Sequence, residues 1–280
     1  MERGGKLAMS LFIIDTDTCT RCGACISVCP TNIIAFGDDG FPAPKSGKEE
    51  RCISCGHCVA VCPSASFSHE AMPVESCQPV ETDLFPRPDG LEHLMRSRRS
   101  IRHYSPEPVD RETLGGIIES VCYAPSGHNS RSLEWVVVYD SEKVKRVAEI
   151  TIDWMRRITK EGKPLARILN FERIVAIWES GEDMICRSAP QLIAVHAPKE
   201  NAIASIDSTI ALGWLDLAAA AHDLGTCWAG FVMICSMHDP RIAKELGIPD
   251  DRALTGAMMI GKSKHSYHRI PVRTAGIAWL

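Results

Sequence analysis

The alternation of apolar and polar positions predicts a mixture of helices and strands after residue 91. The longest helical pattern covers residues 206–224, where apolar side chains recur at steps of three and four residues, the spacing of one helix face. We expect a long, well-buried helix there, and we expect Gly225 to end it in the position that follows the last turn. The apolar positions of this pattern are Ile206, Ile210, Trp214, Leu217, Ala221 and Leu224.

Shorter patterns of the same kind fill the rest of this region. Asp110 is a favourable helix N-cap, and the apolar residues from Leu114 to Val121 that follow it share one helix face. Helices are also expected from Leu91, at 143–158 and at 239–247, and strands at 135–139, 192–197, 226–234 and 254–260. Because helices and strands mix without strict strand–helix–strand alternation, the predicted fold class is α+β.

The chain before residue 91 has a different texture. Residues 63–90 contain five prolines without a period, which is typical of an extended linker. We therefore expect three parts: a small domain at residues 10–70, a proline-rich linker at 71–90 and a larger domain at 91–280.

The small domain carries a cysteine pattern that occurs twice between residues 19 and 63. Both copies have the spacing C-x2-C-x2-C-x3-C-P, with a glycine after the second cysteine. This is the bacterial spacing for iron–sulfur ligation, in which the fourth cysteine of each run ligates the other cluster. Since each iron of a 4Fe–4S cube takes one thiolate, the sequence predicts two such clusters. One is assigned to Cys19, Cys22, Cys25 and Cys62, and the other to Cys29, Cys52, Cys55 and Cys58.

Zinc sites and disulfides are the alternatives for such a set of cysteines. Zinc motifs built from C-x2-C pairs need no third cysteine three residues further on, and they give the x3-C-P ending no role. The stretch thus resembles a bacterial two-cluster ferredoxin module. Eight thiolate ligands favour a reducing compartment, so a cytoplasmic location is expected. The cysteines outside the two runs are expected to be buried free thiols: Cys77, Cys122, Cys186, Cys227 and Cys235.

Composition narrows the classes of partner. The formal net charge is −4, from 31 basic and 35 acidic residues, so the chain lacks the basic character of a nucleic-acid-binding protein. The sequence contains no apolar run of 18 residues, so no membrane span is expected. The hydrophobic fraction of 45% is ordinary for a globular protein.

Three separated segments of the larger domain could converge on an anion and a planar ring. The first is Arg98–Arg102, which supplies planar guanidinium groups and a serine that suit phosphate oxygens. The second is Pro125–Arg131, a loop of small hydrogen-bonding residues, and the third is the basic segment around Arg269. Taken singly, an arginine pair is usually a solvated face and such a loop is usually a turn.

Taken in order, these segments resemble the nitroreductase family of FMN enzymes, over residues 91–280. The resemblance implies a four- to five-stranded antiparallel sheet wrapped by helices, in an intertwined homodimer with FMN at the interface. The segments that carry it are Arg98-Arg99-Ser100-x-Arg102, Ala124-Pro125-Ser126-Gly127-x-Asn129, Arg187-Ser188-Ala189-Pro190, Leu224-Gly225-Thr226-Cys227-Trp228-Ala229-Gly230 and Arg269-Ile270-Pro271.

The resemblance also implies roles for single residues. Arg98, Ser100 and Arg102 would hold the phosphate and ribityl end of FMN, with Arg269 closing on the phosphate. Ser126 and Asn129 would reach the ribityl chain and the isoalloxazine. Backbone N–H groups of Ala229 and Gly230 would lie near flavin N5 and O4. The chain departs from many relatives at Arg131, which stands where they have glutamine. The full expected FMN set is Arg98, Arg99, Ser100, Arg102, Pro125, Ser126, Asn129, Arg131, Ala229, Gly230 and Arg269.

The two cofactor modules together predict an oxidoreductase that passes electrons from the clusters to FMN and on to an organic acceptor. A nitro compound, a quinone, an enone or a flavin would serve as acceptor, and no catalytic residue is assigned. No G-x-G-x-x-G follows a strand, so no Rossmann nucleotide site is predicted, and the donor is either of ferredoxin type or NAD(P)H bound transiently over the flavin. The alternatives are a non-enzymatic electron carrier or redox sensor, and a reductive dehalogenase-type or flavin-degrading relative on the same fold.

Overall fold

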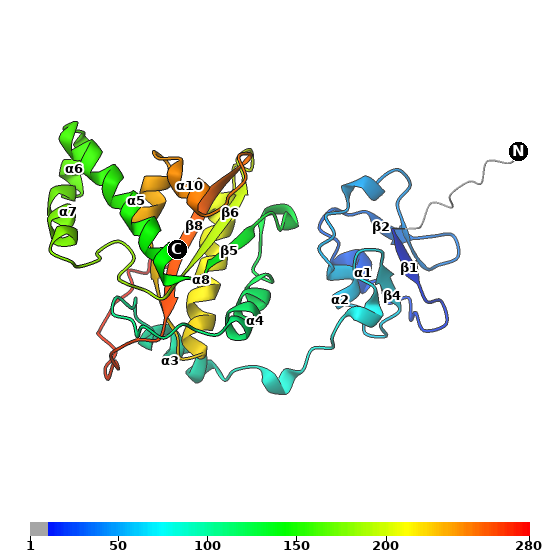
Figure 1. Cartoon of the computed structure of the whole chain (residues 1–280). Helices are drawn as coiled ribbons and strands as arrows, with labels where there is room; N and C mark the ends of the chain where they lie inside the picture. The colour runs from blue at the N-terminus through cyan, green and yellow to red at the C-terminus, as the bar shows by residue number, and fades with distance from the viewer. Residues whose placement is uncertain (1–10) are drawn as a thin grey trace, which may run out of the picture. The chain divides into compact units, whose positions relative to one another are not determined.

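The protein, described here by a computed structural model over residues 11–280, forms two compact units (Figure 1). The smaller unit contains the described residues up to Phe85 together with His128–Ser130. The larger unit contains Pro86–Gly127 and Arg131–Leu280. Residue 10, the first of the expected small domain, lies outside the described residues.

The smaller unit is built from two similar halves around a small apolar core that includes Phe12, Ile34 and Phe67. Two antiparallel ribbons frame it: one pairs the first strand with the last, and the other is a local hairpin. The strands are β1 Phe12–Ile14, β2 Ile34–Phe36, β3 Pro42–Pro44 and β4 Phe67–His69; the helices are α1 Ala24–Ser27 and α2 His57–Ala60, with short 3-10 turns η1 Glu49–Arg51, η2 Val74–Ser76 and η3 Thr82–Leu84.

The repeated sequence produces a repeated backbone in this unit. Gly23 and Gly56 precede α1 and α2 with φ of 71° and 74°, a left-handed conformation that glycine adopts at little cost. Two residues earlier, Arg21 and Ser54 also have positive φ, 54° and 47°. The glycine after the second cysteine therefore has the same structural role in both runs, which is to turn the chain into the short helix that carries the third cysteine.

The larger unit contains one antiparallel sheet of four strands in the order β5-β6-β8-β7. Strand β6 lies in the middle and pairs with β8 along its length, with Ile193 opposite Met258. This sheet agrees with the α+β class and with the four- to five-stranded antiparallel sheet expected from the sequence. The strands are β5 Glu134–Val138, β6 Gln191–Pro198, β7 Gly225–Trp228 and β8 Arg252–Gly261.

Helices cover both faces of this sheet (Figure 1). Successive residues of β6 point to opposite faces: Leu192 and Ala194 join one buried cluster, and Ile193 and Val195 join the other. Residues of two helices complete the hydrophobic cluster around Ile193 and Val195: α4 Arg111–Val121 and α8 Ala204–Ala221. Residues of five helices complete the hydrophobic cluster around Leu192 and Ala194: α5 Ser141–Lys160, α6 Pro164–Ile168, α7 Phe171–Glu179, α9 Gly230–Ser236 and α10 Arg241–Glu245. Helix α3, Pro88–Ser97, precedes them, and η4 spans Gly127–Asn129. No helix formed by residues 11–280 has the length and apolar character needed to cross a membrane.

The helix predicted from the longest apolar pattern exists as α8, but its buried face and its end were predicted wrongly. Ile206 and Trp214 are 60% and 45% exposed, while the opposite side of α8 packs on the sheet and on α4. The helix is apolar on both sides, so spacing alone could not identify the face that the sheet covers. It ends at Ala221, and Asp223 rather than Gly225 takes the left-handed conformation, with φ of 57°. Its buried residues are Ala204, Asp207, Ser208, Ala211, Leu212, Leu215 and Ala219.

The expected strand at 226–234 was wrong in its second half. Strand β7 ends at Trp228, and α9 starts at Gly230. Val232 and Cys235, three residues apart, are the buried residues of α9, which is helical spacing. The continuous apolar run fitted a strand equally well, because a short run of this kind has no period that distinguishes the two.

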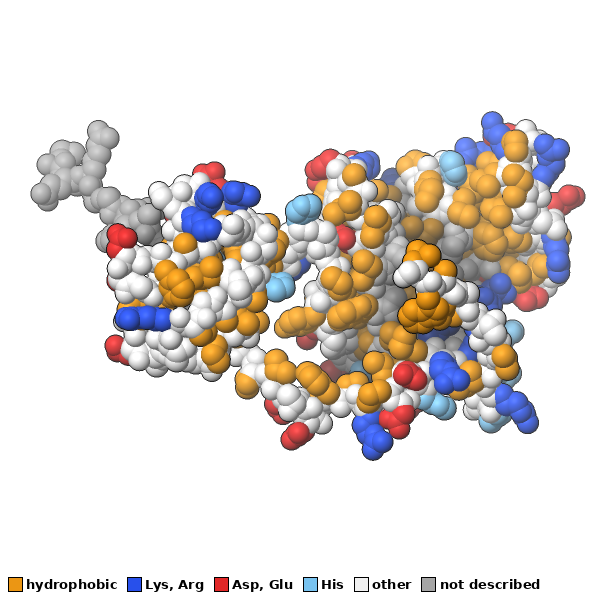
Figure 2. All heavy atoms as spheres, turned by 180° about the vertical axis from the view of Figure 1, so that it is seen from behind, with side chains coloured by type: hydrophobic (Ala, Val, Ile, Leu, Met, Phe, Trp, Pro, Cys, Tyr) orange, Lys and Arg blue, Asp and Glu red, His pale blue; other side chains and the backbone are white. Residues whose placement is uncertain are grey.

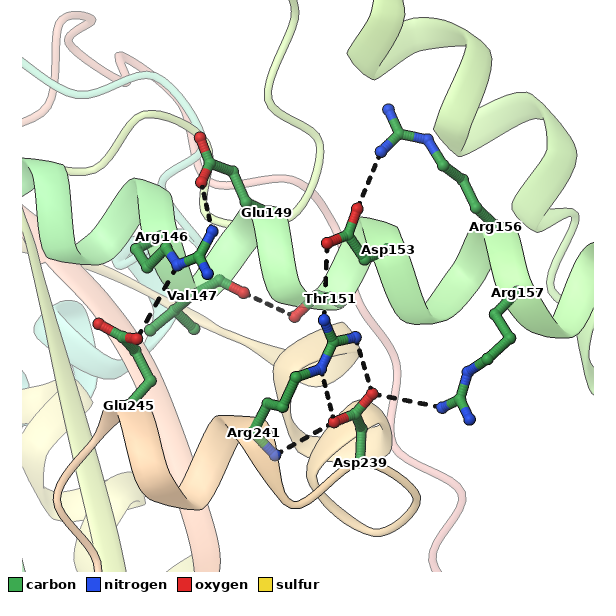
Figure 3. A network of polar contacts seen from close by, with 10 residues as sticks. All are labelled: Arg146, Val147, Glu149, Thr151, Asp153, Arg156, Arg157, Asp239, Arg241 and Glu245. Carbon is green, nitrogen blue, oxygen red and sulfur yellow. Dashed lines mark hydrogen bonds and ion pairs between the residues drawn. The ribbon is translucent and has the colours of Figure 1, made fainter.

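A network of charged side chains joins α5 to the start of α10 (Figure 3). Its centre is the carboxylate of Asp239, which is 5% exposed and accepts hydrogen bonds from the backbone, Nε and Nη2 of Arg241 at 2.9–3.1 Å. Nη2 of Arg157 on α5 donates to the same carboxylate at 3.3 Å. Hydrogen bonds from the Arg241 side chain hold the pKa of Asp239 below its usual range.

Replacing Asp239 by asparagine is expected to lower the free energy of unfolding at pH 7 by about 1–2 kcal/mol. The effect is small because both arginines are about half exposed, and solvent screens their charges. A carboxyl whose folded pKa is depressed stabilises the fold above its unfolded pKa of about 3.9, and this stabilisation is lost as the pH falls through the folded value. Urea unfolding of both proteins between pH 7 and 3 measures this.

The control for that variant is Glu149→Gln, which removes a more exposed partner of Arg146 in a neighbouring ion pair of α5. Its effect is expected to stay within about 0.5 kcal/mol. A difference between wild type and Asp239→Asn that did not shrink below pH 4 would contradict the role given to the carboxylate charge.

Candidate cofactor sites

The eight cysteines of the two runs line two separate small cavities in the smaller unit. Each cavity has three cysteines from one run and the fourth cysteine of the other run, which is the crossed arrangement expected from the sequence. One is lined by Cys19, Cys22, Cys25 and Cys62, and the other by Cys29, Cys52, Cys55 and Cys58. Four thiols around one space are the donor set of a 4Fe–4S cube, so these residues fit the cofactor.

Local structure places the third and fourth cysteine of each run differently. Cys25 and Cys58 lie on α1 and α2, where burial raises the pKa of each thiol, to about 11 for Cys58. Cys29 and Cys62 follow those helices. Burial acts to raise the pKa of these two thiols as well, but hydrogen bonds from nearby backbone and hydroxyl groups outweigh it and lower both.

Two buried side chains that contact cysteine sulfurs in this unit were not predicted from the sequence. Ser66 Oγ lies 3.3 Å from Sγ of Cys62, and Nε2 of His69 lies 3.4 Å from Sγ of Cys52. Both are buried, and both follow the second run closely in the sequence. A buried polar residue just after the C-P ending was the available signal, but no spacing rule connects it to one particular sulfur.

In the larger unit, the segment Arg98–Arg102 is fixed along the sheet edge. The N–H of Ile101 donates to the carbonyl of Thr226 in β7 at 2.9 Å. Nη1 of Arg98 donates to Asp216 of α8 at 2.7 Å, and the same carboxylate accepts from the hydroxyl of Thr226. Asp216 was not predicted, because the contact joins residues more than a hundred positions apart. It neutralises part of the charge expected to face a phosphate.

Polar atoms without partners lie in this same region. Within residues 11–280, Nε of Arg98 and the hydroxyl of Tyr104 are buried and make no hydrogen bond. Burial raises the pKa of Tyr104 far above its usual range. Burial also raises the pKa of Cys227, while the charges of Arg102 and Arg187 act in the opposite direction, so both arginines lie near this thiol. Positive charge and unpaired donors fit an anionic cofactor. Arg187 lies in one of the segments that carry the family resemblance, but no role was predicted for it from the sequence.

The loop Pro125–Gly127 is attached to the other end of α8. Its Gly127 N–H donates to the buried carboxylate of Asp207 at 3.0 Å. The N–H of Arg131, itself exposed with φ of 43°, donates to Ser126 Oγ at 3.2 Å. Asp207 and Asp216 are nine residues apart, which is about 14 Å along a helix axis. The arginine segment and this loop are therefore held by different ends of one helix.

The structure does not bring the remaining expected FMN residues together in one group. Asn129 belongs to the smaller unit, where its Nδ2 donates to the carbonyls of Ile53 and Ser54 at 3.0 and 2.9 Å. The Ala229 N–H donates to the carbonyl of Ala257, so it is used within the sheet, and Gly230 begins α9. Arg269 is exposed in the C-terminal segment, and the Arg99 side chain donates to backbone carbonyls of Arg96 and Ser97. The FMN contacts of these residues stay predictions.

Solved structures share the fold of the larger unit. A nitroreductase with bound FMN from Bacteroides fragilis is similar with a TM-score of 0.56 at 21% identity, covering 68% of this chain and 98% of that one. A nitroreductase with bound FMN from Desulfitobacterium hafniense also has a TM-score of 0.56, at 20% identity, covering 68% and 97%.

Curated relatives cover parts of the chain. An FMN reductase (NAD(P)H) of Bacillus subtilis is 31% identical over 140 residues, 49% of this chain and 53% of that protein. The chain therefore spans about half the length of this relative. A 5,6-dimethylbenzimidazole synthase of Rhodospirillum rubrum is 26% identical over 196 residues, 65% of this chain and 86% of that protein.

Two protein families match different parts of the chain. Residues 11–63 match the 4Fe-4S dicluster domain, and residues 95–262 match the nitroreductase family, which is more than half of the chain. These matches confirm the fold class and the cofactors expected from the sequence, which are FMN and two 4Fe–4S clusters. The chain belongs to the nitroreductase family and carries a 4Fe–4S dicluster domain ahead of the nitroreductase domain.

Proposed function

We propose that this FMN-dependent oxidoreductase takes up electrons at two 4Fe–4S clusters in the smaller unit and passes them through FMN to an organic acceptor. The observation that carries the proposal is the placement of eight cysteines around two cavities in a chain that also has the nitroreductase fold. Clusters exchange single electrons, whereas a flavin accepts them singly and delivers a pair.

The residues of the larger unit would bind and orient FMN. Arg98 and Arg102, with Arg187 beside them, supply positive charge for the phosphate, and the unpaired Arg98 Nε supplies a donor. The loop that Asp207 holds at Gly127 would contact the other end of the cofactor. The two segments, held at different ends of α8, would therefore contact different parts of the cofactor.

We also propose that the protein is a homodimer. One side of α8 leaves Ile206 and Trp214 exposed, and the C-terminal segment exposes Val272 and Trp279. Figure 2 shows further hydrophobic side chains at the surface of the larger unit. Exposed large apolar side chains suit an interface, and we propose that a second copy of the chain covers them.

The acceptor is proposed only as a class: a nitro compound, quinone, enone or flavin. The proposed donor is a low-potential one-electron carrier of ferredoxin type, because clusters that exchange single electrons suit such a carrier. NAD(P)H is the second candidate, favoured by the similarity to the FMN reductase (NAD(P)H) of Bacillus subtilis.

The proposal is tested on protein purified without oxygen. We expect bound flavin and about eight iron atoms per chain, and we expect a low-potential one-electron donor to reduce the flavin. Cys55→Ala is expected to keep the flavin but to slow its reduction by that donor about 100-fold or more, since losing even an outer partner of a metal site costs about 10- to 100-fold.

The matched control is Cys77→Ala, which removes a cysteine of the smaller unit outside both runs. Cys77 and Cys122 are exposed, so the expectation of buried thiols was wrong for these two and holds for Cys186, Cys227 and Cys235. The control variant is expected to change neither the iron content nor the rate. Iron without flavin or turnover would favour an electron carrier instead, and an unchanged rate in Cys55→Ala would remove the clusters from the electron path.

A further inference from the structure

His69 ends β4 in the smaller unit and lies next to a cysteine assigned to a cluster. Its Nε2 is 3.4 Å from Sγ of Cys52, and its Nδ1 accepts a hydrogen bond from the N–H of Ala71 at 3.0 Å. A neutral imidazole has one N–H and one acceptor nitrogen. Because Nδ1 is the acceptor here, the ring proton is on Nε2 and points at the sulfur.

This contact is shielded from water. His69 is 4% exposed, and the backbone N–H of Ser54 donates to the same sulfur at 3.4 Å. Hydrogen bonds to an ionised acceptor are stronger than neutral ones, and a low local dielectric strengthens them further. The imidazole N–H therefore stabilises negative charge on the Cys52 thiolate.

The first run has no equivalent of this histidine. The offset that relates Cys19 to Cys52 relates Phe36 to His69, and a phenylalanine ring has no N–H to donate. The cavity that contains Cys19 has a different donor, the hydroxyl of Ser66, which lies 3.3 Å from Cys62. Ser64 donates to Ser66 at 3.1 Å, which leaves the Ser66 proton free for the sulfur. A hydroxyl also lies near the fourth cysteine of each run, Thr31 at 3.6 Å from Cys29 and Ser64 at 3.8 Å from Cys62, so the two cysteine sets differ in His69 and Ser66.

We propose that His69 tunes the cluster bound by Cys29, Cys52, Cys55 and Cys58, raising its reduction potential and increasing its share of the first electron that enters the smaller unit. This proposal rests on the proposed function, in which the eight cysteines bind two 4Fe–4S clusters. One electron added to a cluster increases the negative charge on its thiolates, and the His69 N–H stabilises that increase.

The electron balance of this step is simple. One electron leaves the reduced cluster at Cys19 and enters the oxidised cluster at Cys52. No bond is formed or broken, and no proton moves, because His69 keeps its Nε2–H in both states. The electron comes from the low-potential one-electron donor of the proposed function.

The test is a redox titration of the iron-loaded full chain with dithionite, followed by EPR of both reduced clusters. His69→Phe introduces the residue of the first run. It is expected to shift the electron equilibrium away from the cluster at Cys52 about tenfold, which is about 59 mV for a one-electron couple. His69→Gln retains an N–H donor and is expected to recover part of this shift.

Ser66→Ala is the matched control, because it is expected to lower the potential of the other cluster and to leave the cluster at Cys52 unchanged. The inference is overturned if His69→Phe leaves both potentials unchanged or shifts the same signal as Ser66→Ala. A wild-type chain that binds no iron–sulfur cluster would overturn the proposed function as well, so the two failures are distinguishable.

A second measurement keeps the inference testable if His69→Phe does not load its clusters. Wild-type protein labelled with 15N-histidine is expected to show nitrogen coupling to a reduced cluster in pulse EPR. The coupling should persist in His57→Phe, which removes the exposed histidine beside Cys58. No coupling, or coupling lost in His57→Phe, would contradict the hydrogen bond from His69.

Discussion

The double variant Cys22→Ala/Cys62→Ala is expected to lose one cluster and keep the other, whereas Cys22→Ala/Cys29→Ala is expected to lose both. Cys22 and Cys62 line one cavity, and Cys29 lines the other. Both double variants remove two ligand cysteines, but only the second takes one ligand from each cluster. Iron analysis should give about four atoms per chain in the first case and close to none in the second.

Ligation without crossing would reverse this result. If each run held its own cluster, Cys22→Ala/Cys29→Ala would retain about four iron atoms per chain and Cys22→Ala/Cys62→Ala would lose nearly all of them. The two variants remove the same number of thiols, so a general loss of stability affects both alike. Circular dichroism of the larger unit's helices, with flavin content, provides the reference for each preparation.

The two iron–sulfur sites could be predicted from the sequence because most of their cysteine ligands are separated by only two or three residues. Three of the four ligands of each cluster lie within seven consecutive residues, and the fourth is the cysteine before the proline of the other run. The donors that distinguish the two clusters could not be predicted. His69 reaches Cys52 only because β4 closes on the start of the unit, a contact that depends on the tertiary fold.

The FMN region was less predictable for the same reason. Motifs identified the arginines, since a guanidinium suits phosphate wherever it stands. Asp216 and Asp207 were not found, although each holds one of the two segments in place. Both lie on the helix whose buried face was predicted wrongly. The two acidic residues of this otherwise apolar helix were the available signal, because a buried carboxylate needs a hydrogen-bond or ion-pair partner elsewhere in the fold.

Gly225→Ala is expected to reduce both stability and FMN affinity. A Cβ at this position would lie 2.1 Å from Cγ1 and 2.6 Å from Cβ of Ile101. A change of rotamer moves Cγ1 but leaves Cβ in place, so the backbone itself must shift. Ile101 is buried and its N–H is bonded to β7, which restricts that movement. Overpacking of this kind costs about 1–3 kcal/mol, measurable by urea unfolding.

The same shift would displace Ser100 and Arg102, which flank Ile101 in the segment proposed to hold the FMN phosphate. We expect FMN affinity to fall about tenfold, the equivalent of about 1.4 kcal/mol, in a fluorescence titration of the apoprotein. The matched control is Gly116→Ala on the exposed side of α4, where a Cβ meets nothing within 4 Å. Alanine there is expected to stabilise the helix by about 0.5–1 kcal/mol and to leave FMN affinity unchanged. If Gly225→Ala lost stability but bound FMN normally, the Arg98–Arg102 segment would not be the phosphate site.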